Sequence, residues 1–444
     1  HYPAPFAMIR LWREFAGADL KTRYEQEARS IAELMCSDTS RNLVRVFMLQ
    51  DRLKSLGRDA KFDCDHVHVI GAGVMGGDIA AWCAMRGMTV TLQDREAKYL
   101  APAMTRAEKL FRKRLKRPRA VQAAMDRLQP DVAGDGVPRA DVLIEAIFEN
   151  VEAKQALFRD VEPRMKPDAI IATNTSSIRL EDLSPALADP ARLIGLHFFN
   201  PVAMMPLVEI IHGEGTRQSE VDKGLAFARR IGKFPLPCKS SPGFVVNRVL
   251  MPYMMEAMQV GEEGVPLAAI DKASTDFGMP MGPVELADTV GLDVALSVAG
   301  VFAREFGMPI SDTLKNLVEK KQLGRKTGRG FYEYKKGKPV KEIDKSYQPP
   351  PDLGDRLLLP LVNEAVALLR EGVVEDKDLL DAGVIFGTGF APFTGGPINY
   401  AETRGIAEVR NALTELSRLH GERFEPDAGW SMLAPTVVEH GAAA

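Results

Sequence analysis

A histidine and a glutamate lie on two neighbouring apolar runs that are typical of strands. His197 follows the apolar residues 193–196, and Glu209 is the lone acid among the aliphatic residues 206–211. Residues 198–201, Phe-Phe-Asn-Pro, predict a turn, so a loop that folds back would bring the two side chains together. A carboxylate beside an imidazole fixes its tautomer and makes it a general base for an alcohol proton. The alternative is a core histidine with satisfied hydrogen bonds and a surface glutamate.

A glycine pattern follows the first strand-like run, residues 66–70. The glycines are Gly71, Gly73 and Gly76, and they open an alanine-rich helical segment. In such a turn the first glycine permits the tight bend, the second lets the backbone approach a pyrophosphate, and the third lets helix pack on strand. The helix N-terminus attracts the phosphates. The spacing on its own also fits ordinary turns, but its position between strand and helix predicts a dinucleotide site.

An acidic residue ends the next strand-like run, residues 89–93. Asp94 follows the glycine turn and its helix at the end of this second run, where an acid accepts hydrogen bonds from the ribose hydroxyls and repels a 2′-phosphate. This favours NAD over NADP, although Arg95 directly after it softens the discrimination. The alternative for Asp94 is a helix N-cap.

Hydroxyl side chains follow another strand-like run, residues 169–172. Residues 173–177 read Thr-Asn-Thr-Ser-Ser and fall at the carboxyl edge of the sheet, where ligands bind in open α/β sheets. Helix capping and turn formation are the alternative uses of these residues.

The elements that must position these groups change character along the chain. Residues 1–57 have helical spacing and no strand, and they resemble an arm that packs on something else. Residues 66–237 alternate strands with helices, which predicts a mostly parallel, doubly wound sheet. After Pro242 helical period dominates, and the pattern of residues 247–264 returns at residues 355–372. This repeat predicts two copies of one helical unit. The expected domains are 1–61 (helical linker), 62–241 (α/β), 242–335 (first helical copy), 336–352 (linker) and 353–444 (second helical copy).

Composition excludes several classes of protein. The 444 residues carry a net charge of −3 and are 45% hydrophobic, which is typical of a globular enzyme and gives no global field for nucleic acid. The sequence has no apolar run of about 18 residues, the length that predicts a membrane span. The four cysteines form no CxxC pair, so we expect no metal site and a reducing compartment. The chain starts at His1 rather than Met, so we expect the natural N-terminus to be missing.

Taken together, these segments resemble the L-3-hydroxyacyl-CoA dehydrogenase family. The resemblance covers about residues 62–335 and includes the glycine turn with Asp94, residues 144–150, residues 173–177, the run from His197 to Glu209, and residues 242–248. It implies a Rossmann-type NAD-binding domain followed by two homologous all-α domains. It also implies NAD-dependent oxidation of L-3-hydroxyacyl-CoA to 3-ketoacyl-CoA.

The resemblance assigns roles to matching positions. His197 removes the 3-hydroxyl proton and Glu209 polarises it, while Ser176 and Asn247 hydrogen-bond the substrate. The cofactor-binding set that it implies is Gly71, Gly73, Met75, Gly76, Asp94, Glu149, Lys154, Asn200 and Lys326.

The remaining segments are similar to the α-subunit of the multifunctional fatty-acid β-oxidation complex. There a helical linker joins an enoyl-CoA hydratase domain to the dehydrogenase, and a second helical copy follows. The similarity implies a dehydrogenase half without its hydratase domain, a cytoplasmic location, and a thiolase β-subunit as partner. Because the second copy would occupy the surface through which simpler relatives dimerise, we expect a monomer.

Two features and two alternatives accompany this interpretation. Phe386 stands where bacterial α-subunits have a substrate-contacting tyrosine. The basic run from Lys109 to Arg119 is either a solvated helix face or a surface that attracts the phosphates of CoA. The alternative functions are a non-catalytic NAD-binding scaffold and another NAD-dependent 3-hydroxy-acid dehydrogenase.

Overall fold

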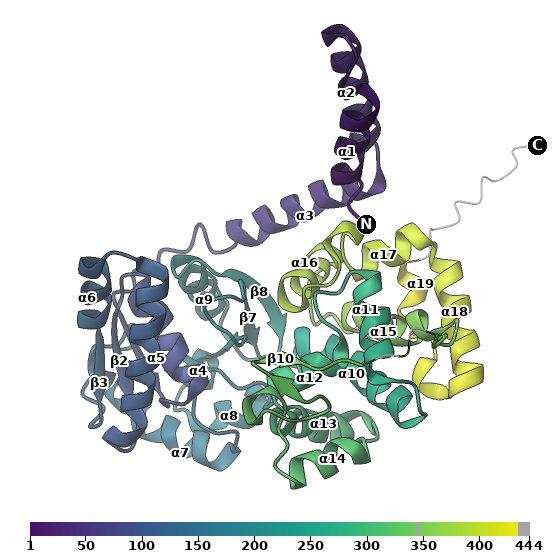
Figure 1. Cartoon of the computed structure of the whole chain (residues 1–444). Helices are drawn as coiled ribbons and strands as arrows, with labels where there is room; N and C mark the ends of the chain where they lie inside the picture. Colours follow the sequence, from purple (N-terminus) through teal and green to yellow (C-terminus); the bar gives the residue numbers. More distant parts are fainter. Residues whose placement is uncertain (343, 345, 434–444) are drawn as a thin grey trace, which may run out of the picture.

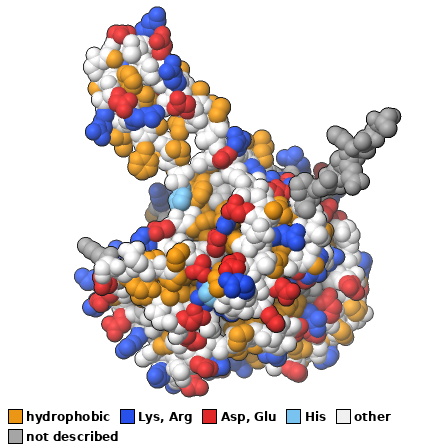
Figure 2. Space-filling model, turned by 90° about the vertical axis from the view of Figure 1, so that its right-hand side faces the viewer, with side chains coloured by type: hydrophobic (Ala, Val, Ile, Leu, Met, Phe, Trp, Pro, Cys, Tyr) orange, Lys and Arg blue, Asp and Glu red, His pale blue; other side chains and the backbone are white. Residues whose placement is uncertain are grey.

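A helical arm precedes the sheet. The computed structural model describes residues 1–342, 344 and 346–433. Helices α1 and α2 lie side by side and project from the body, and α3 leads back along it (Figure 1). Many apolar side chains of the arm are exposed (Figure 2), including Phe6 and Trp12 at 73% and 67%. The bounds are α1 Ala4–Phe15, α2 Leu20–Met35 and α3 Asp38–Ser55.

An eight-stranded sheet forms the core of the α/β part. Its order is β3-β2-β1-β4-β5-β6-β7-β8, and every neighbouring pair is parallel except β6 and β7, which run antiparallel. The expected mostly parallel sheet is therefore confirmed. The strands are β1 His66–Ile70, β2 Thr89–Gln93, β3 Leu128–Asp131, β4 Val142–Glu145, β5 Ile170–Thr173, β6 Leu193–Phe198, β7 Leu207–His212 and β8 Phe234–Lys239.

Helices cover both faces of this sheet, as a doubly wound fold requires. One core cluster joins one sheet face to apolar residues of α4, α5, α6 and α9. The other joins the opposite face to α7, α8 and the helical part of the chain. The bounds are α4 Val74–Met85, α5 Ala97–Leu115, α6 Pro118–Arg127, α7 Val151–Val161, α8 Leu180–Leu183 and α9 Gln218–Arg230.

Two sets of four helices follow in the same order. The first set is α10 Val246–Glu262, α11 Leu267–Phe277, α12 Pro283–Val290 and α13 Leu292–Phe306. The second set is α15 Leu353–Arg370, α16 Lys377–Thr388, α17 Pro397–Arg404 and α18 Ile406–His420. Helix α14 Asp312–Glu319 and the short strands β9 Tyr334–Lys335 and β10 Lys338–Pro339 lie between the sets, and α19 Trp430–Leu433 follows the second. Residues 343 and 345 of the expected linker, and 434–444 of the expected second copy, lie outside the described residues.

The two sets contact each other reciprocally through α10 and α15. Arg248 of α10 pairs with Glu364 and Glu371 of the second set, at 2.6 and 2.5 Å. Arg356 is the counterpart of Arg248 in the sequence repeat, and it pairs with Glu256 and Glu263, the counterparts of those two acids. When residue i contacts j and the equivalent of j contacts the equivalent of i, the interface is isologous. The two helical sets are thus related as two subunits of a symmetric dimer would be.

Candidate active site

The histidine and glutamate singled out in the sequence face each other in the sheet. His197 on β6 and Glu209 on β7 are direct partners in the antiparallel register, and His197 Nδ1 lies 2.6 Å from Glu209 Oε2. His197 is 5% exposed and Glu209 is fully buried. With Nδ1 bound to the carboxylate, Nε2 is the nitrogen that can accept a proton. The alternative of a surface glutamate is therefore wrong.

The same carboxylate also anchors the start of α10. Glu209 Oε1 accepts the backbone N–H groups of Val245 and Val246 at 3.0 and 2.9 Å. These donors belong to the beginning of the helix, where N–H groups lack intrahelical partners and attract an anion. The next residue is Asn247, whose Nδ2 donates to the carbonyl of Ser176 at 3.3 Å. One buried glutamate therefore fixes both the imidazole and the helix that carries Asn247.

Ser176 is held from the opposite side by Glu149. Both the backbone N–H and the hydroxyl of Ser176 donate to Glu149 Oε1, at 2.7 and 3.1 Å. Glu149 in turn lies 3.3 Å from Lys154 Nζ, which also contacts Glu145 at 2.6 Å. Lys154 is 1% exposed, so it lies behind Glu149 and holds it in place.

Three residues that had no individual role assigned from the sequence complete the support. Thr173 donates to Glu145 Oε2 at 2.6 Å, and Asn174 Oδ1 accepts the N–H of Phe198 at 2.9 Å. Both come from the polar run at the carboxyl end of β5, which is the signal that could have identified them. Val245 acts through its backbone N–H, so its residue type gives no signal.

Aromatic rings surround the imidazole. The rings of Phe199 and Phe244 have centroids 4.6 and 5.6 Å from that of His197. Such a site excludes water and strengthens the interactions of the imidazole with Glu209.

The loop between β6 and β7 is tied down by a buried lysine. Lys233 is 4% exposed, and its Nζ donates to the carbonyls of Val202 and Met205, the latter at 2.6 Å. It also lies 4.2 Å from the centroid of the Trp82 ring. Burial lowers the pKa of Lys233 to about 8.

The glycine turn has the geometry of a pyrophosphate site. Gly71 has φ +106°, and a side chain at Gly76 would lie 1.9 Å from the carbonyl oxygen of Gly71. At Gly73 a side-chain carbon would meet no described atom within 4 Å, so the space in front of the α4 N-terminus is open. Gly71 and Gly76 thus meet the expected demands of a tight turn and of helix–strand packing, while the approach of a pyrophosphate at Gly73 stays a prediction. Met75, in the first turn of α4, is half-buried.

Asp94 faces the glycine turn. Its Oδ2 accepts the N–H of Ala72 at 2.8 Å, and its Oδ1 accepts the N–H of Arg95. Helix α5 begins at Ala97 with Glu96 at its N-cap position, so the alternative of a helix cap for Asp94 is wrong.

Two of the expected cofactor residues, Asn200 and Lys326, are not joined to the other site residues by any hydrogen bond or ion pair among the described residues. Asn200 is exposed at the end of β6 and precedes Pro201 through a cis peptide bond. Lys326 pairs with Asp293 at the start of α13 and is about half-exposed.

Phe386 on α16 packs edge-on against Phe234 of β8, with centroids 5.1 Å apart.

A cleft of about 510 Å³ opens between Glu149 and Ser177 on one side and α13 on the other. Arg179 and Arg304 lie on its lining.

The basic run from Lys109 to Arg119 lies at the end of α5 and the start of α6. There Arg112 pairs with Glu108 and Arg114 donates to the carbonyl of Ala203.

No group of three His, Cys, Asp or Glu side chains among the described residues could hold a metal ion. No single helix in the described ranges is long and apolar enough to cross a membrane; only α12 and α13 taken together, with a bend of 106° between them, pass that test.

Comparison with known proteins places both halves of the site in one family. Residues 66–241 match the 3-hydroxyacyl-CoA dehydrogenase NAD-binding domain, and residues 243–334 match the C-terminal domain of the same family. The chain is 36% identical to the fatty acid oxidation complex subunit alpha of Vibrio cholerae over 449 aligned positions, which cover 97% of this chain and 63% of that protein. It therefore spans less than two thirds of this relative.

Solved structures give the same result. The 3-hydroxybutyryl-CoA dehydrogenase of Escherichia coli K12 superposes with a TM-score of 0.72 and 26% identity, covering 84% of this chain and 98% of that one. The dehydrogenase part of multifunctional enzyme 1 from C. elegans gives 0.63 and 27%, covering 89% of this chain and 99% of that one.

Proposed function

Since the chain belongs to the 3-hydroxyacyl-CoA dehydrogenase family, we propose that it oxidises L-3-hydroxyacyl-CoA thioesters to 3-ketoacyl-CoA thioesters with NAD. The observation that carries this proposal is the buried His197–Glu209 pair. Asn247, which follows the α10 residues that Glu209 anchors, is joined to Ser176, and the next residue, Ser177, lines the cleft.

The residues of the chain divide the chemistry among them. His197 Nε2 accepts the proton of the substrate 3-hydroxyl, and Glu209 stabilises the imidazolium that results. Ser176 and Asn247 hold the reacting oxygen beside the imidazole. NAD held at the glycine turn would supply the acceptor for the hydride that leaves C3 as the carbonyl forms. In the reverse direction the imidazolium returns its proton to the oxygen.

The residues of the glycine turn fit NAD. Gly73 leaves open the space that a pyrophosphate needs, and Gly71 and Gly76 tolerate no side chain. Asp94 places a carboxylate beside this turn, where it would accept hydrogen bonds from the ribose hydroxyls and repel a 2′-phosphate. We assign the remaining contacts with NAD to Met75, Glu149, Asn200 and Lys326, with Lys154 acting through Glu149.

We further propose a pathway, a location, a partner and an oligomeric state for this dehydrogenase. Similarity to a bacterial fatty acid oxidation complex subunit supports a role in β-oxidation, a cytoplasmic location and a thiolase β-subunit as partner. The reciprocal ion pairs between the two helical sets support a monomeric chain, because the second set covers the surface that a partner subunit would need.

The decisive experiment follows NADH oxidation with acetoacetyl-CoA as substrate. The wild-type chain should consume NADH, and His197→Ala should lose about 10²–10⁴-fold in kcat. NADH affinity, measured by fluorescence, should be the same in both. A wild-type protein that binds NADH but does not turn over acetoacetyl-CoA would contradict the proposal and favour a non-catalytic scaffold.

A further inference from the structure

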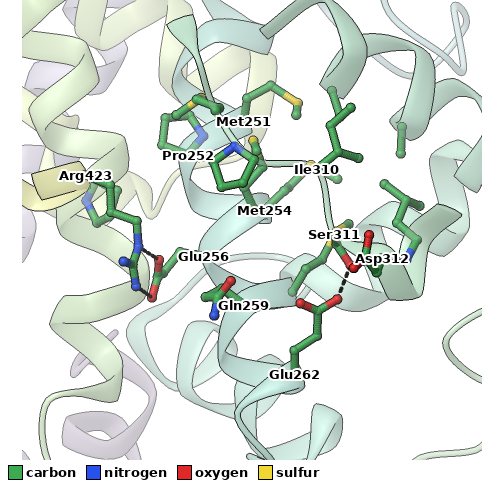
Figure 3. A pocket seen from close by; sticks show the side chains of 18 residues that line it. Met251, Pro252, Met254, Glu256, Gln259, Glu262, Ile310, Ser311, Asp312 and Arg423 are labelled. Atoms are coloured by element: carbon green, nitrogen blue, oxygen red, sulfur yellow. Dashed lines mark hydrogen bonds and ion pairs between the residues drawn. The ribbon is translucent and has the colours of Figure 1, made fainter. Parts of the chain in front are cut away.

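An apolar cavity of about 300 Å³ lies in the helical part of the chain, outside the cleft of the active site. It is lined by α10, α13 and residues 308–314, together with Pro360 and Arg423 of the second set (Figure 3). Methionine dominates its lining, with Met251, Met254, Met255 and Met258 from α10 and Met308 from the opposite wall. Met side chains are unbranched and adapt their shape to a flexible apolar ligand.

The cavity begins one helical turn along α10 from Asn247. Asn247 and Met251 are four residues apart on α10, so they share a face of this helix. At a rise of about 1.5 Å per residue, Met251 lies about 6 Å along the helix axis from Asn247, and Met258 about 16 Å. Methionines 254, 255 and 258 continue in the same direction.

In the second helical set, larger side chains fill the space that is equivalent to this cavity. Ala295 and Ala299 of α13 occupy the same positions in their helix as Val409 and Leu413 do in α18, a helix of equal length. Both of these larger side chains are fully buried. The groove of the first set is therefore widened by two small residues.

A tryptophan closes the equivalent groove of the second set. Met255 corresponds to Asn363, whose Oδ1 accepts the indole N–H of Trp430 at 2.7 Å. Trp430 is 1% exposed, and the adjacent Gly429 lies against Val366, the counterpart of Met258. The same helical framework thus holds a plug in one copy and a cavity in the other.

We propose that this cavity holds the acyl tail of the substrate beyond C3 and sets the preference for chain length. The proposal rests on the proposed dehydrogenase function. A four-carbon acyl group has one carbon beyond C3, and one carbon–carbon bond of about 1.5 Å does not reach Met251. A longer tail enters between α10 and α13 once the flexible side chain of Met251 changes rotamer, and it gains apolar contacts with each added carbon.

Polar pairs limit the apolar path. Glu262 accepts the hydroxyl of Ser311 at 2.6 Å, and Glu256 is paired with Arg423 at 2.6 Å (Figure 3). An apolar tail cannot replace these contacts, so its continuation past them is unfavourable. The cavity therefore favours tails of intermediate length.

The test fills the cavity with the residues of the second set. Calorimetry compares binding of decanoyl-CoA and butyryl-CoA, neither of which requires turnover. Wild type should bind decanoyl-CoA at least tenfold more tightly, equivalent to about 1.4 kcal/mol, and Ala295→Val/Ala299→Leu should reduce this ratio to less than threefold. The control Ala303→Val changes the same helix outside the cavity lining and should retain the wild-type ratio.

Turnover separates this proposal from the proposed function. In the filled variant kcat/KM should fall about tenfold for 3-ketodecanoyl-CoA and stay within twofold for acetoacetyl-CoA. Equal losses for both substrates, an unchanged binding ratio, or a wild type that does not discriminate between the two acyl-CoAs would overturn the cavity assignment. A wild type that turns over neither substrate would reject the dehydrogenase function, while the binding ratio would still decide the cavity. If the double variant does not fold, Ala299→Val alone serves the same comparison.

Discussion

At the scale of single residues, Glu209 connects the two halves of the site. Its two oxygens serve different elements, one the His197 imidazole on β6 and the other the first N–H groups of α10. Because both oxygens are buried and occupied, neither the tautomer of His197 nor the position of Asn247 can change without breaking a charge-assisted hydrogen bond. We therefore expect catalysis to require the negative charge of Glu209, and not only the shape of its side chain.

Replacement of Glu209 by glutamine tests this expectation. If the glutamine side chain still accepts the α10 N–H groups with its oxygen, its NH₂ group faces His197 Nδ1. The imidazole must then carry its proton on Nε2, where it cannot act as the base. We expect kcat to fall about 10²–10⁴-fold with NADH affinity unchanged.

The double variant supplies the control for Glu209. If Glu209 acts through the imidazole, His197→Ala/Glu209→Gln should be no slower than His197→Ala alone, because residues that act as a unit are not additive. Multiplied losses in the double variant would show that Glu209 acts by another route.

Sequence pattern identifies this pair because strand alternation and a turn are local features. His197 and Glu209 are close in the sequence and meet by pairing of adjacent strands. The hydrogen bonds of Glu209 to Val245 and Val246 could not be predicted, because they join segments 36 and 37 residues apart through backbone atoms. The burial of Lys154 was not predicted either, because its sequence does not show that the side chain turns back onto Glu145 and Glu149, nine and five residues earlier.

At the scale of elements, the β6–β7 connection is held by a side chain from outside it. Its carbonyls at Val202 and Met205 receive hydrogen bonds from Lys233, which precedes β8. Because this loop joins the strand of the base to the strand of its carboxylate, Lys233 is a positioning residue for the pair.

Lys233→Met should change both stability and its pH dependence. Two buried carbonyls lose a donor, which costs about 1–3 kcal/mol of unfolding free energy. In wild type burial lowers the pKa of Lys233 to about 8, below the value of about 10.4 in an unfolded chain. The unfolded state then binds more protons between these values, so this group makes the unfolding free energy rise with pH from about 8 to 10.

Urea unfolding at pH 7.5, 8.5 and 9.5 measures this effect. The difference between wild type and Lys233→Met should grow with pH over this range. Lys239→Met, at the exposed end of the same strand β8, is the matched control and should leave the pH dependence as in wild type. A constant difference between wild type and Lys233→Met across the three pH values would show that Lys233 does not titrate there.

Helices and strands could be predicted where the apolar residues recur regularly or where turn residues mark the ends of an element. The long apolar strands and the repeated turn positions of the helical sets are recognisable in sequence. Strand β3 is not, because Leu128–Asp131 contains Gln129 and Pro130, both exposed, at the edge of the sheet. Its position is fixed by pairing with β2 rather than by its own composition.

At the scale of the whole molecule, the two helical sets form a dimer-like unit within one chain. A sequence repeat indicates two similar units, but it does not say which faces meet. The reciprocal pairs of Arg248 and Arg356 supply that information. The two arginines differ in their neighbours, since Arg248 follows Asn247 directly while Arg356 follows Asp355.

Substitution of the two equivalent arginines by methionine therefore separates stability from catalysis. Each change removes one arginine from two acids of the opposite set, of which Glu371 keeps Arg370 and Glu256 keeps Arg423. We expect each to lower the unfolding free energy by at least about 1–3 kcal/mol. Only Arg248→Met should also lower kcat/KM for acetoacetyl-CoA, because it frees the first turn of α10 that carries Asn247. Thermal unfolding and steady-state kinetics of both variants measure the two effects. A similar loss of kcat/KM in Arg356→Met would mean that the second set acts on the reacting centre through contacts other than those of Arg248.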